Sequence, residues 1–173
     1  QGTERVLDIG TGTGHTALAV AQGANHVVGI DLTPQMLEQA RQLAAERQIT
    51  NVTFEEGDAQ RLRHEDDSFD VVTCRVCAHH FADPLATVRE SARVLRPGGC
   101  ILWLDSVVPA DPAQDTFLNT IELLRDPSHV RDFSISQWQA MFAEVGLAAE
   151  VAGQWATDLL FDDWTDRQSP AEE

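Results

Sequence analysis

The chain has 173 residues, 43% of them hydrophobic and 23% charged, which is enough for one domain that folds without disulfide bonds. Acidic residues outnumber basic ones by 28 to 12, and the formal charge of −16 would repel the phosphate backbone of a nucleic acid. The absence of lysine excludes a lysine Schiff base and a phosphate-loop lysine. Apolar stretches are too short to span a bilayer and the three cysteines too few for a secreted disulfide framework, so we expect a soluble, cytoplasmic protein.

The first part of the chain alternates short β-rich runs with helical patterns, which predicts parallel strands joined by crossover helices. Strands are expected over residues 5–10 and 26–31, with a helix over 14–22 between them. A second helix should begin after Thr33 as its N-cap, with Pro34 at its first position. Its apolar residues recur at helical spacing and predict a buried stripe of Met36, Ala40, Leu43 and Ala44.

The middle of the chain continues this alternation. Strands are expected over residues 52–58, 69–75 and 100–105. A proline after Asp83 opens a helix between the last two strands, and the Pro-Gly-Gly run at 97–99 is expected to end it. The apolar face of this helix is predicted to consist of Leu85, Val88, Ala92 and Leu95.

Two helices and one strand are expected in the last part of the chain. The helices cover residues 111–125 and 136–145, and Ser136 with Gln139 has the spacing of a capping box for the second. Residues 148–155 are expected to form a sixth strand. The whole pattern predicts a single α/β domain with a doubly wound, Rossmann-like and mostly parallel sheet.

A glycine-rich loop follows the first expected strand. Residues 8–14 read Asp-Ile-Gly-Thr-Gly-Thr-Gly, and such glycines let the backbone pass close to a ligand. The G-x-G-x-G spacing differs from the G-x-G-x-x-G spacing of dinucleotide sites. A tight turn without a ligand is the plain alternative.

Two further acids end neighbouring strands on the same rim. Asp31 can accept the hydroxyl hydrogens of an adenosine ribose, a feature shared with NAD enzymes. Asp58 can accept a hydrogen bond from the adenine amine, or it can simply be a turn or helix-cap residue. We therefore expect three strand ends to line one crevice of nucleoside size.

Five segments of the chain, taken together, resemble the class I S-adenosylmethionine (SAM)-dependent methyltransferases, especially their ubiquinone/menaquinone-type branch. These segments are VLDIGTGTG, VVGIDLTPQMLEQAR, EEGDA, DDSFDVVTCRVCAHHF and RVLRPGG. The likeness covers about residues 4–106 and weakens beyond them. It implies the strand order 3-2-1-4-5-7-6, with strand seven antiparallel.

The resemblance also implies a SAM site, with S-adenosylhomocysteine as the product and without a metal. The residues that it assigns are Asp8, Gly10, Gly12 and Gly14 for the methionine moiety, Asp31 for the ribose, Leu32 and Met36 for adenine packing, Asp58 and Ala59 for the adenine edge, and Arg75 for a backbone contact near the donor's amino group. Ordinary core packing is the alternative for Leu32 and Met36.

Methyl transfer needs a base only when the acceptor carries a proton, and a histidine suits that task. His79 and His80 are the candidates, with a purely structural role as the alternative. The Cys74-x-x-Cys77 pair lacks a second pair to complete a zinc site. Because the chain is acidic and lacks the Asn/Asp-Pro-Pro-aromatic tetrad of nucleic-acid methyltransferases, we expect a small, neutral or apolar acceptor.

Two other functions remain open: a non-catalytic relative that binds SAM, and an NAD-dependent oxidoreductase, which would more often have a Tyr and Lys pair. The first strand begins almost at residue 1 and the chain ends in an acidic tail, so we expect a domain truncated at both ends and lacking the family's last strand. The strand at 100–105 would then pair with 148–155 or leave an edge through which copies of the chain associate.

Overall fold

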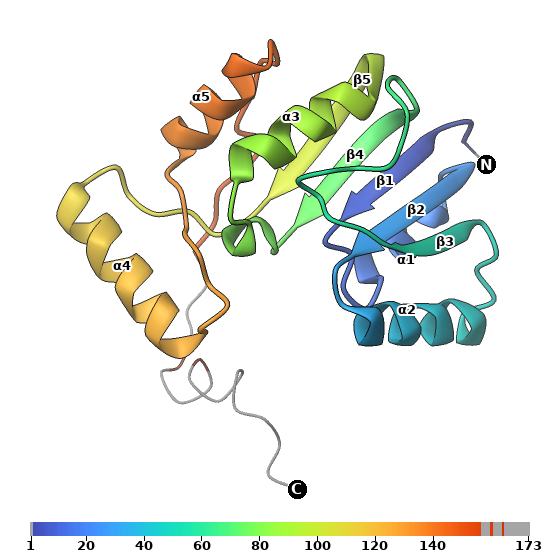
Figure 1. Ribbon diagram of the computed structural model, residues 1–173, viewed down its shortest axis with the longest axis horizontal. Helices are drawn as coiled ribbons and strands as arrows, with labels where there is room; N and C mark the ends of the chain where they lie inside the picture. Colours follow the sequence, from blue (N-terminus) through green and yellow to red (C-terminus); the bar gives the residue numbers. More distant parts are fainter. Residues whose placement is uncertain (1, 157–159, 161–163, 165–173) are drawn as a thin grey trace, which may run out of the picture. The chain divides into compact units, whose positions relative to one another are not determined.

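A five-stranded parallel sheet forms the frame of the first part of the chain (Figure 1). The structure, a computed structural model, describes residues 2–156, 160 and 164. The chain divides into two compact units, Gln1–Ser106 and Val107–Glu173, and the sheet belongs to the first.

The sheet has the order β3-β2-β1-β4-β5, and each neighbouring pair of strands is parallel. Its strands are β1 (Arg5–Ile9), β2 (His26–Asp31), β3 (Val52–Glu56), β4 (Phe69–Arg75) and β5 (Leu95–Leu104). This confirms the α/β class and the first five positions of the expected order. No described residue extends the sheet beyond β5.

Helices connect the strands, as the alternating pattern predicts. The first unit contains α1 (His15–Ala21), α2 (Pro34–Glu46), the short 3-10 helix η1 (Ala78–His80) and α3 (Pro84–Val94); the second contains α4 (Pro112–Arg125) and α5 (Ile135–Glu144). Figure 1 shows α3 in front of β4 and β5, whereas α1 lies behind the sheet. Among the described residues, no helix is both long and apolar enough to cross a membrane.

Apolar side chains fill the space between the sheet and the helices α1 and α2. Val6, Val27 and Phe54 of the strands pack in one cluster with Leu18 and Leu37 of the helices. The four inner residues of β2 are all buried, which explains why this strand is an unbroken apolar run rather than an alternating one. The loops at the ends of the strands are therefore attached to a rigid frame.

The start of β5 differs from the expectation. The strand begins at Leu95, directly after α3, and not at residue 100. Leu95 pairs with Phe69, and the next pair in the register joins Val71 to Cys100. The Pro-Gly-Gly run therefore lies in an irregularity within the strand, because a bulge can accommodate residues that regular pairing cannot.

The capping box of α5 also lies two residues before its expected place. The Ser134 hydroxyl accepts a hydrogen bond from the Gln137 backbone N–H at 3.3 Å, and the Gln137 side chain accepts one from the Ser134 N–H at 2.8 Å. The assignment to Ser136 and Gln139 was wrong, because both pairs have the same spacing and only the start of the helix distinguishes them.

The edge of the sheet at β5 has no second partner strand within the described part of the chain. Residues 148–155 form no strand, so the expected sixth strand is wrong. An unpaired edge exposes backbone N–H and C=O groups that can bind another strand. Self-association through β5 therefore stays a prediction.

Asp70 is expected to stabilise the first unit in a pH-dependent way. Hydrogen bonds from the Arg5 backbone N–H and the Arg96 guanidinium hold the pKa of Asp70 below its ordinary value. A lowered carboxyl pKa stabilises the fold above the ordinary carboxyl range, and this contribution is lost as the pH falls through the folded-state pKa. Asp70→Asn should cost about 1 kcal/mol at neutral pH, since the pair is partly exposed to solvent.

Urea unfolding of wild type and Asp70→Asn at a series of pH values tests this expectation. The two curves should converge in acid, where Asp70 is protonated in both states. A difference in unfolding free energy that stays constant down to the lowest pH would contradict the assignment.

Candidate functional site

The carboxyl ends of the parallel strands meet on one rim of the sheet (Figure 1). Asp8 pairs with Gly29 and Asp31 pairs with Glu56, so the ends of β1, β2 and β3 are in register. The glycine loop leaves β1 at this rim. Crevices at the carboxyl ends of such sheets are where doubly wound domains bind ligands.

The glycines of the loop have left-handed backbone conformations, with φ of +61° at Gly10 and +53° at Gly12. A Cβ at Gly10 would lie 2.4 Å from Sγ of Cys77, so this glycine allows two loops to pack together. A Cβ at Gly12 would meet no atom within 4 Å. The two positions therefore differ: Gly10 is required by packing, whereas Gly12 borders open space.

Asp31 joins the end of β2 to the glycine loop. Its Oδ2 accepts a hydrogen bond from the Gly12 backbone N–H at 2.8 Å, and its Oδ1 accepts one from the Thr33 N–H at 2.9 Å. Thr33 is the N-cap of α2 as predicted, but its side chain makes no capping bond. The carboxylate of Asp31 thus lies beside the open side of Gly12.

Asp8 lies beneath the loop and is 1% exposed. Its carboxylate accepts hydrogen bonds from the hydroxyls of Thr11 at 2.7 Å and Thr73 at 2.5 Å. Burial raises the pKa of Asp8 above its ordinary value, and these hydrogen bonds and the charge of Arg75 oppose the rise. The structure therefore shows Asp8 holding the loop from below, while Arg75 is exposed at the end of β4.

Asp58 and Ala59 follow β3 in a tight turn. Oδ1 of Asp58 accepts hydrogen bonds from the backbone N–H of Gln60 at 2.8 Å and from its side-chain amide at 3.2 Å. Asp58 is therefore a turn residue, as one of its two expected roles requires, and Ala59 is buried. A cavity of about 350 Å³ adjoins Asp58, and its walls include Gly57 and Leu62.

Leu32 and Met36 are both exposed, with 64% and 41% of their surface accessible. Ordinary core packing is therefore wrong for them. The buried stripe of α2 consists instead of Leu37, Ala40 and Ala44. Two apolar side chains thus stay on the surface just after Asp31, at the position where the resemblance places an adenine ring.

The loop after β4 packs against the glycine loop. Its first residue, Val76, has a φ of +52°, an unusual conformation for a β-branched residue, and its N–H donates to the Leu104 carbonyl at 2.8 Å. Sγ of Cys77 lies 3.4 Å from the Ile9 carbonyl and 3.3 Å from Sγ of Cys74. Burial raises the pKa of the Cys74 thiol well above its ordinary value, which disfavours the thiolate that metal and redox chemistry need.

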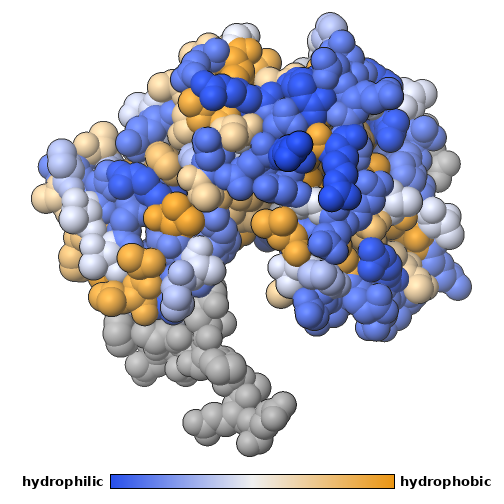
Figure 2. All heavy atoms as spheres, viewed as in Figure 1, coloured by the Kyte–Doolittle hydropathy of each residue, from blue (hydrophilic) through white to orange (hydrophobic). Residues whose placement is uncertain are grey.

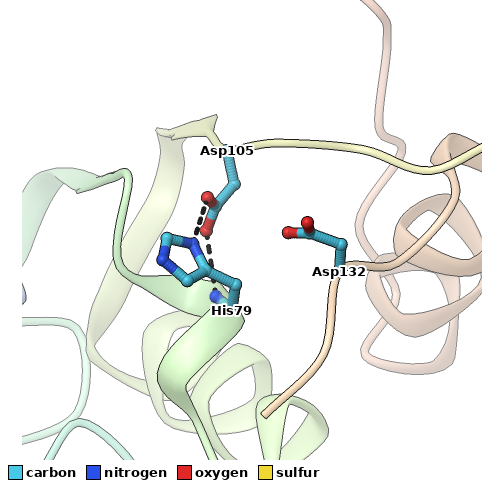
Figure 3. Close-up of side chains that lie close together, drawn as sticks. All are labelled: His79, Asp105 and Asp132. Atoms are coloured by element: carbon cyan, nitrogen blue, oxygen red, sulfur yellow. Dashed lines mark hydrogen bonds and ion pairs between the residues drawn. The ribbon is translucent and has the colours of Figure 1, made fainter. Parts of the chain in front are cut away.

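His79 lies on η1 and is hydrogen-bonded to Asp105, the residue that directly follows β5 (Figure 3). Nδ1 of His79 is 2.7 Å from Oδ1 of Asp105, and the His79 backbone N–H donates to Oδ2 at 3.1 Å. The His80 ring packs against His79, with 4.1 Å between ring centroids. Sequence reasoning missed Asp105, although this acid directly follows the end of its strand, a position similar to that of Asp31 in β2.

Comparison with known proteins agrees with this geometry. A family model described as "Methyltransferase domain" matches residues 1–155. The uncharacterized methyltransferase YcgJ of Bacillus subtilis is 47% identical over 163 residues, which are 94% of this chain and 64% of YcgJ. The crystal structure of the YcgJ protein superimposes with a TM-score of 0.94, covering 98% of this chain and 73% of that chain at 46% identity.

Two further relatives differ in name. A demethylmenaquinone methyltransferase of Deinococcus radiodurans is 47% identical over 108 residues, 61% of this chain and 44% of that enzyme. The [4+2]-cyclase SpnF has a TM-score of 0.72 and 29% identity, covering 84% of this chain and 51% of that chain. The chain therefore spans less than two thirds of the length of YcgJ and of the Deinococcus enzyme. With a family match that covers most of its length, the chain belongs to the methyltransferase domain family and has the class I SAM-dependent methyltransferase fold.

Proposed function

We propose that this chain is the SAM-binding domain of a methyltransferase that acts on a small molecule. The observation that carries the proposal is the hydrogen bond from the Gly12 N–H to Asp31. This hydrogen bond joins a glycine loop that borders open space at Gly12 to a carboxylate at the end of β2. One element can then hold the amino-acid part of the donor while the other accepts the ribose hydroxyls. The family match supports the same assignment.

When bound, SAM supplies a methyl group on a sulfonium sulfur, and the protein has mainly to align the reactants and exclude water. The rim residues fit this molecule. We assign the methionine moiety to Gly10, Gly12, Gly14 and Arg75, with Asp8 supporting this loop from below, the ribose to Asp31, the adenine face to Leu32 and Met36, and the adenine edge to Asp58 and Ala59. The exposed, apolar side chains of Leu32 and Met36 suit a planar ring in particular.

The acceptor is proposed to be small and either neutral or apolar. The face drawn in Figure 2 is largely hydrophilic. The formal charge of −16 disfavours a polyanionic acceptor. The Deinococcus relative is named for demethylmenaquinone, an acceptor of the proposed kind. A methyl-transfer screen with small molecules tests this part of the proposal.

Asp31→Ala should weaken SAM binding by about 1–3 kcal/mol, or on the order of 5- to 150-fold, because charged hydrogen bonds to the ribose are lost. Titration calorimetry with SAM and with S-adenosylhomocysteine measures the change. Glu38→Ala, which removes an exposed acid from α2, is the control for net charge. Equal affinities of Asp31→Ala and wild type for both ligands would refute the ribose assignment.

A non-catalytic or differently catalytic SAM-binding protein is the second candidate. The observation that favours it is the structural likeness to SpnF, which is named as a cyclase. Binding of SAM by calorimetry, combined with no methyl transfer to any acceptor in the screen, would support this candidate over the first.

A further inference from the structure

The side chain of His79 is held in one orientation by Asp105. The carboxylate receives two donors from the same residue, the ring at Nδ1 and the backbone N–H, at 2.7 and 3.1 Å (Figure 3). It also accepts a hydrogen bond from the Ser106 N–H at 2.9 Å. The Asp105 side chain is 2% exposed and that of His79 is 14% exposed. Water therefore competes little for this pair.

This arrangement determines which ring nitrogen carries the proton in the neutral imidazole. An ionised carboxylate only accepts hydrogen bonds, so Nδ1 must donate to it. The remaining nitrogen, Nε2, then holds the lone pair. A histidine oriented in this way by a carboxylate can accept a proton at Nε2.

The pair lies on the rim where the glycine loop begins. Cys77, two residues before His79, contacts the Ile9 carbonyl and fills the space beside Gly10. The loop that carries His79 is therefore packed against the loop assigned to the methionine moiety of the donor. Asp105 reaches the same place because β4 and β5 are parallel neighbours, with Arg75 paired to Leu104.

We infer that His79 is the general base of the methyl transfer, that Asp105 is its positioning residue, and that the acceptor presents an O–H or N–H group at the atom that is methylated. The inference rests on the proposed function. The acceptor's X–H bond breaks and its proton passes to Nε2 of His79, while the X–C bond forms and the electron pair of the C–S bond stays on sulfur. The imidazolium then returns the proton to water.

The bond to Asp105 distinguishes His79 from His80, the other candidate base. A buried carboxylate stabilises the imidazolium that forms when His79 accepts the proton. The role of His80 stays a prediction; its ring forms one wall against which His79 packs.

The first test measures the tautomer of His79 in the ligand-free protein by ¹⁵N–¹H correlation NMR, with its signals assigned by their loss in His79→Gln. Wild type should show a protonated Nδ1 and an unprotonated Nε2. In Asp105→Asn, the side-chain NH₂ replaces one of the carboxylate oxygens that accept hydrogen bonds from His79 and Ser106. Because an NH₂ group donates and cannot accept, the tautomer of His79 that is protonated at Nε2 should become more populated. A wild-type ring protonated at Nε2 and bare at Nδ1 would overturn the inference whatever the activity.

The second test compares acceptors with and without a transferable proton. A panel of phenols, hydroquinones and primary amines supplies X–H groups, and potassium iodide supplies a nucleophile that needs no base. In His79→Gln and Asp105→Asn, kcat for the X–H acceptors should fall about 10²- to 10⁴-fold while iodide methylation and SAM affinity stay near wild type. His26→Gln is the control, because His26 lies at the end of β2 away from Asp31. It should leave turnover of the X–H acceptors, iodide methylation and SAM affinity unchanged.

The outcomes separate this inference from the proposed function. Unchanged turnover of X–H acceptors in His79→Gln, or an equal loss with X–H acceptors and iodide, would overturn the role of His79 as base. If the wild type methylated iodide but none of the X–H acceptors, the inference that the acceptor presents an O–H or N–H group would be overturned. Wild type that binds SAM but methylates nothing, or does not bind SAM, would instead refute the proposed function, and the tautomer measurement would still report on Asp105.

Discussion

Gly10→Ala is expected to lower the free energy of unfolding by about 2–5 kcal/mol, because it adds a steric clash to an unfavourable backbone conformation. The new Cβ would lie 2.4 Å from Sγ and 2.8 Å from Cβ of Cys77, and the position has a φ of +61°. Relief of the clash requires the glycine loop and the loop after β4 to separate. Chemical denaturation of the ligand-free protein measures the loss, and calorimetry should show weakened SAM binding as well.

Gly12→Ala is the matched control in the same loop. Its φ of +53° imposes a similar conformational cost of about 1–2 kcal/mol, but a Cβ there meets nothing within 4 Å. Its main effect should be on SAM affinity, since it fills open space at the proposed site. Adding Cys77→Gly to Gly10→Ala removes both clashing atoms, so Gly10→Ala should be less destabilising in the Cys77→Gly background than in the wild type. Equal destabilisation by Gly10→Ala and Gly12→Ala would contradict the packing role of Gly10.

Phe69→Ala is expected to destabilise the protein by about 3–5 kcal/mol, as for other large-to-small substitutions in a core. The side chain is fully buried at the start of β4. Its ring meets His64 edge-on at 5.0 Å between centroids, and the Arg5 guanidinium lies 4.9 Å above it. Urea unfolding measures the change, and Phe69→Leu should lose only about 1 kcal/mol because it leaves a smaller cavity.

The same substitution has a second, local readout. Burial is the main cause that lowers the pKa of His64 in the wild type. Water admitted by Phe69→Ala would reduce that desolvation, so the pKa of His64 should rise toward its ordinary value. An NMR titration of His64 measures this change. A large loss of stability with an unchanged His64 titration would mean that the cavity collapses instead of filling with water.

Local sequence determined most of the elements because their signals lie within a few residues. The bounds of β2 and β4 were predicted correctly, since each is an apolar run bounded by turn residues. The start of α3 at Pro84 was also predicted correctly; the structure adds that Asp83 is its N-cap, with a side chain that accepts a hydrogen bond from the Ala86 N–H. The start of β5 was predicted wrongly. The Pro-Gly-Gly run at 97–99 indicates a turn locally, but pairing with β4 keeps these residues within the strand as an irregularity.

The site was determined in part. Asp31 and the glycines are adjacent to strand ends, so the topology of a parallel sheet was sufficient to bring them together. Helical spacing alone assigned Met36 to the core, but the packing of α2 against β3 buries Leu37 instead and leaves Met36 exposed. Which face of an amphipathic helix is buried depends on the sheet beneath it.

The tertiary structure alone joined His79 to Asp105. The two residues are far apart in the sequence, and no local pattern links a histidine after one strand to an acid after the next. Parallel pairing of β4 with β5 places both strand ends on the same rim, where both the ring and the backbone N–H of His79 reach the Asp105 carboxylate. The sequence by itself thus determined the α/β class and the glycine loop through short-range signals, whereas the orientation of His79 required contacts that exist only once the strands are paired.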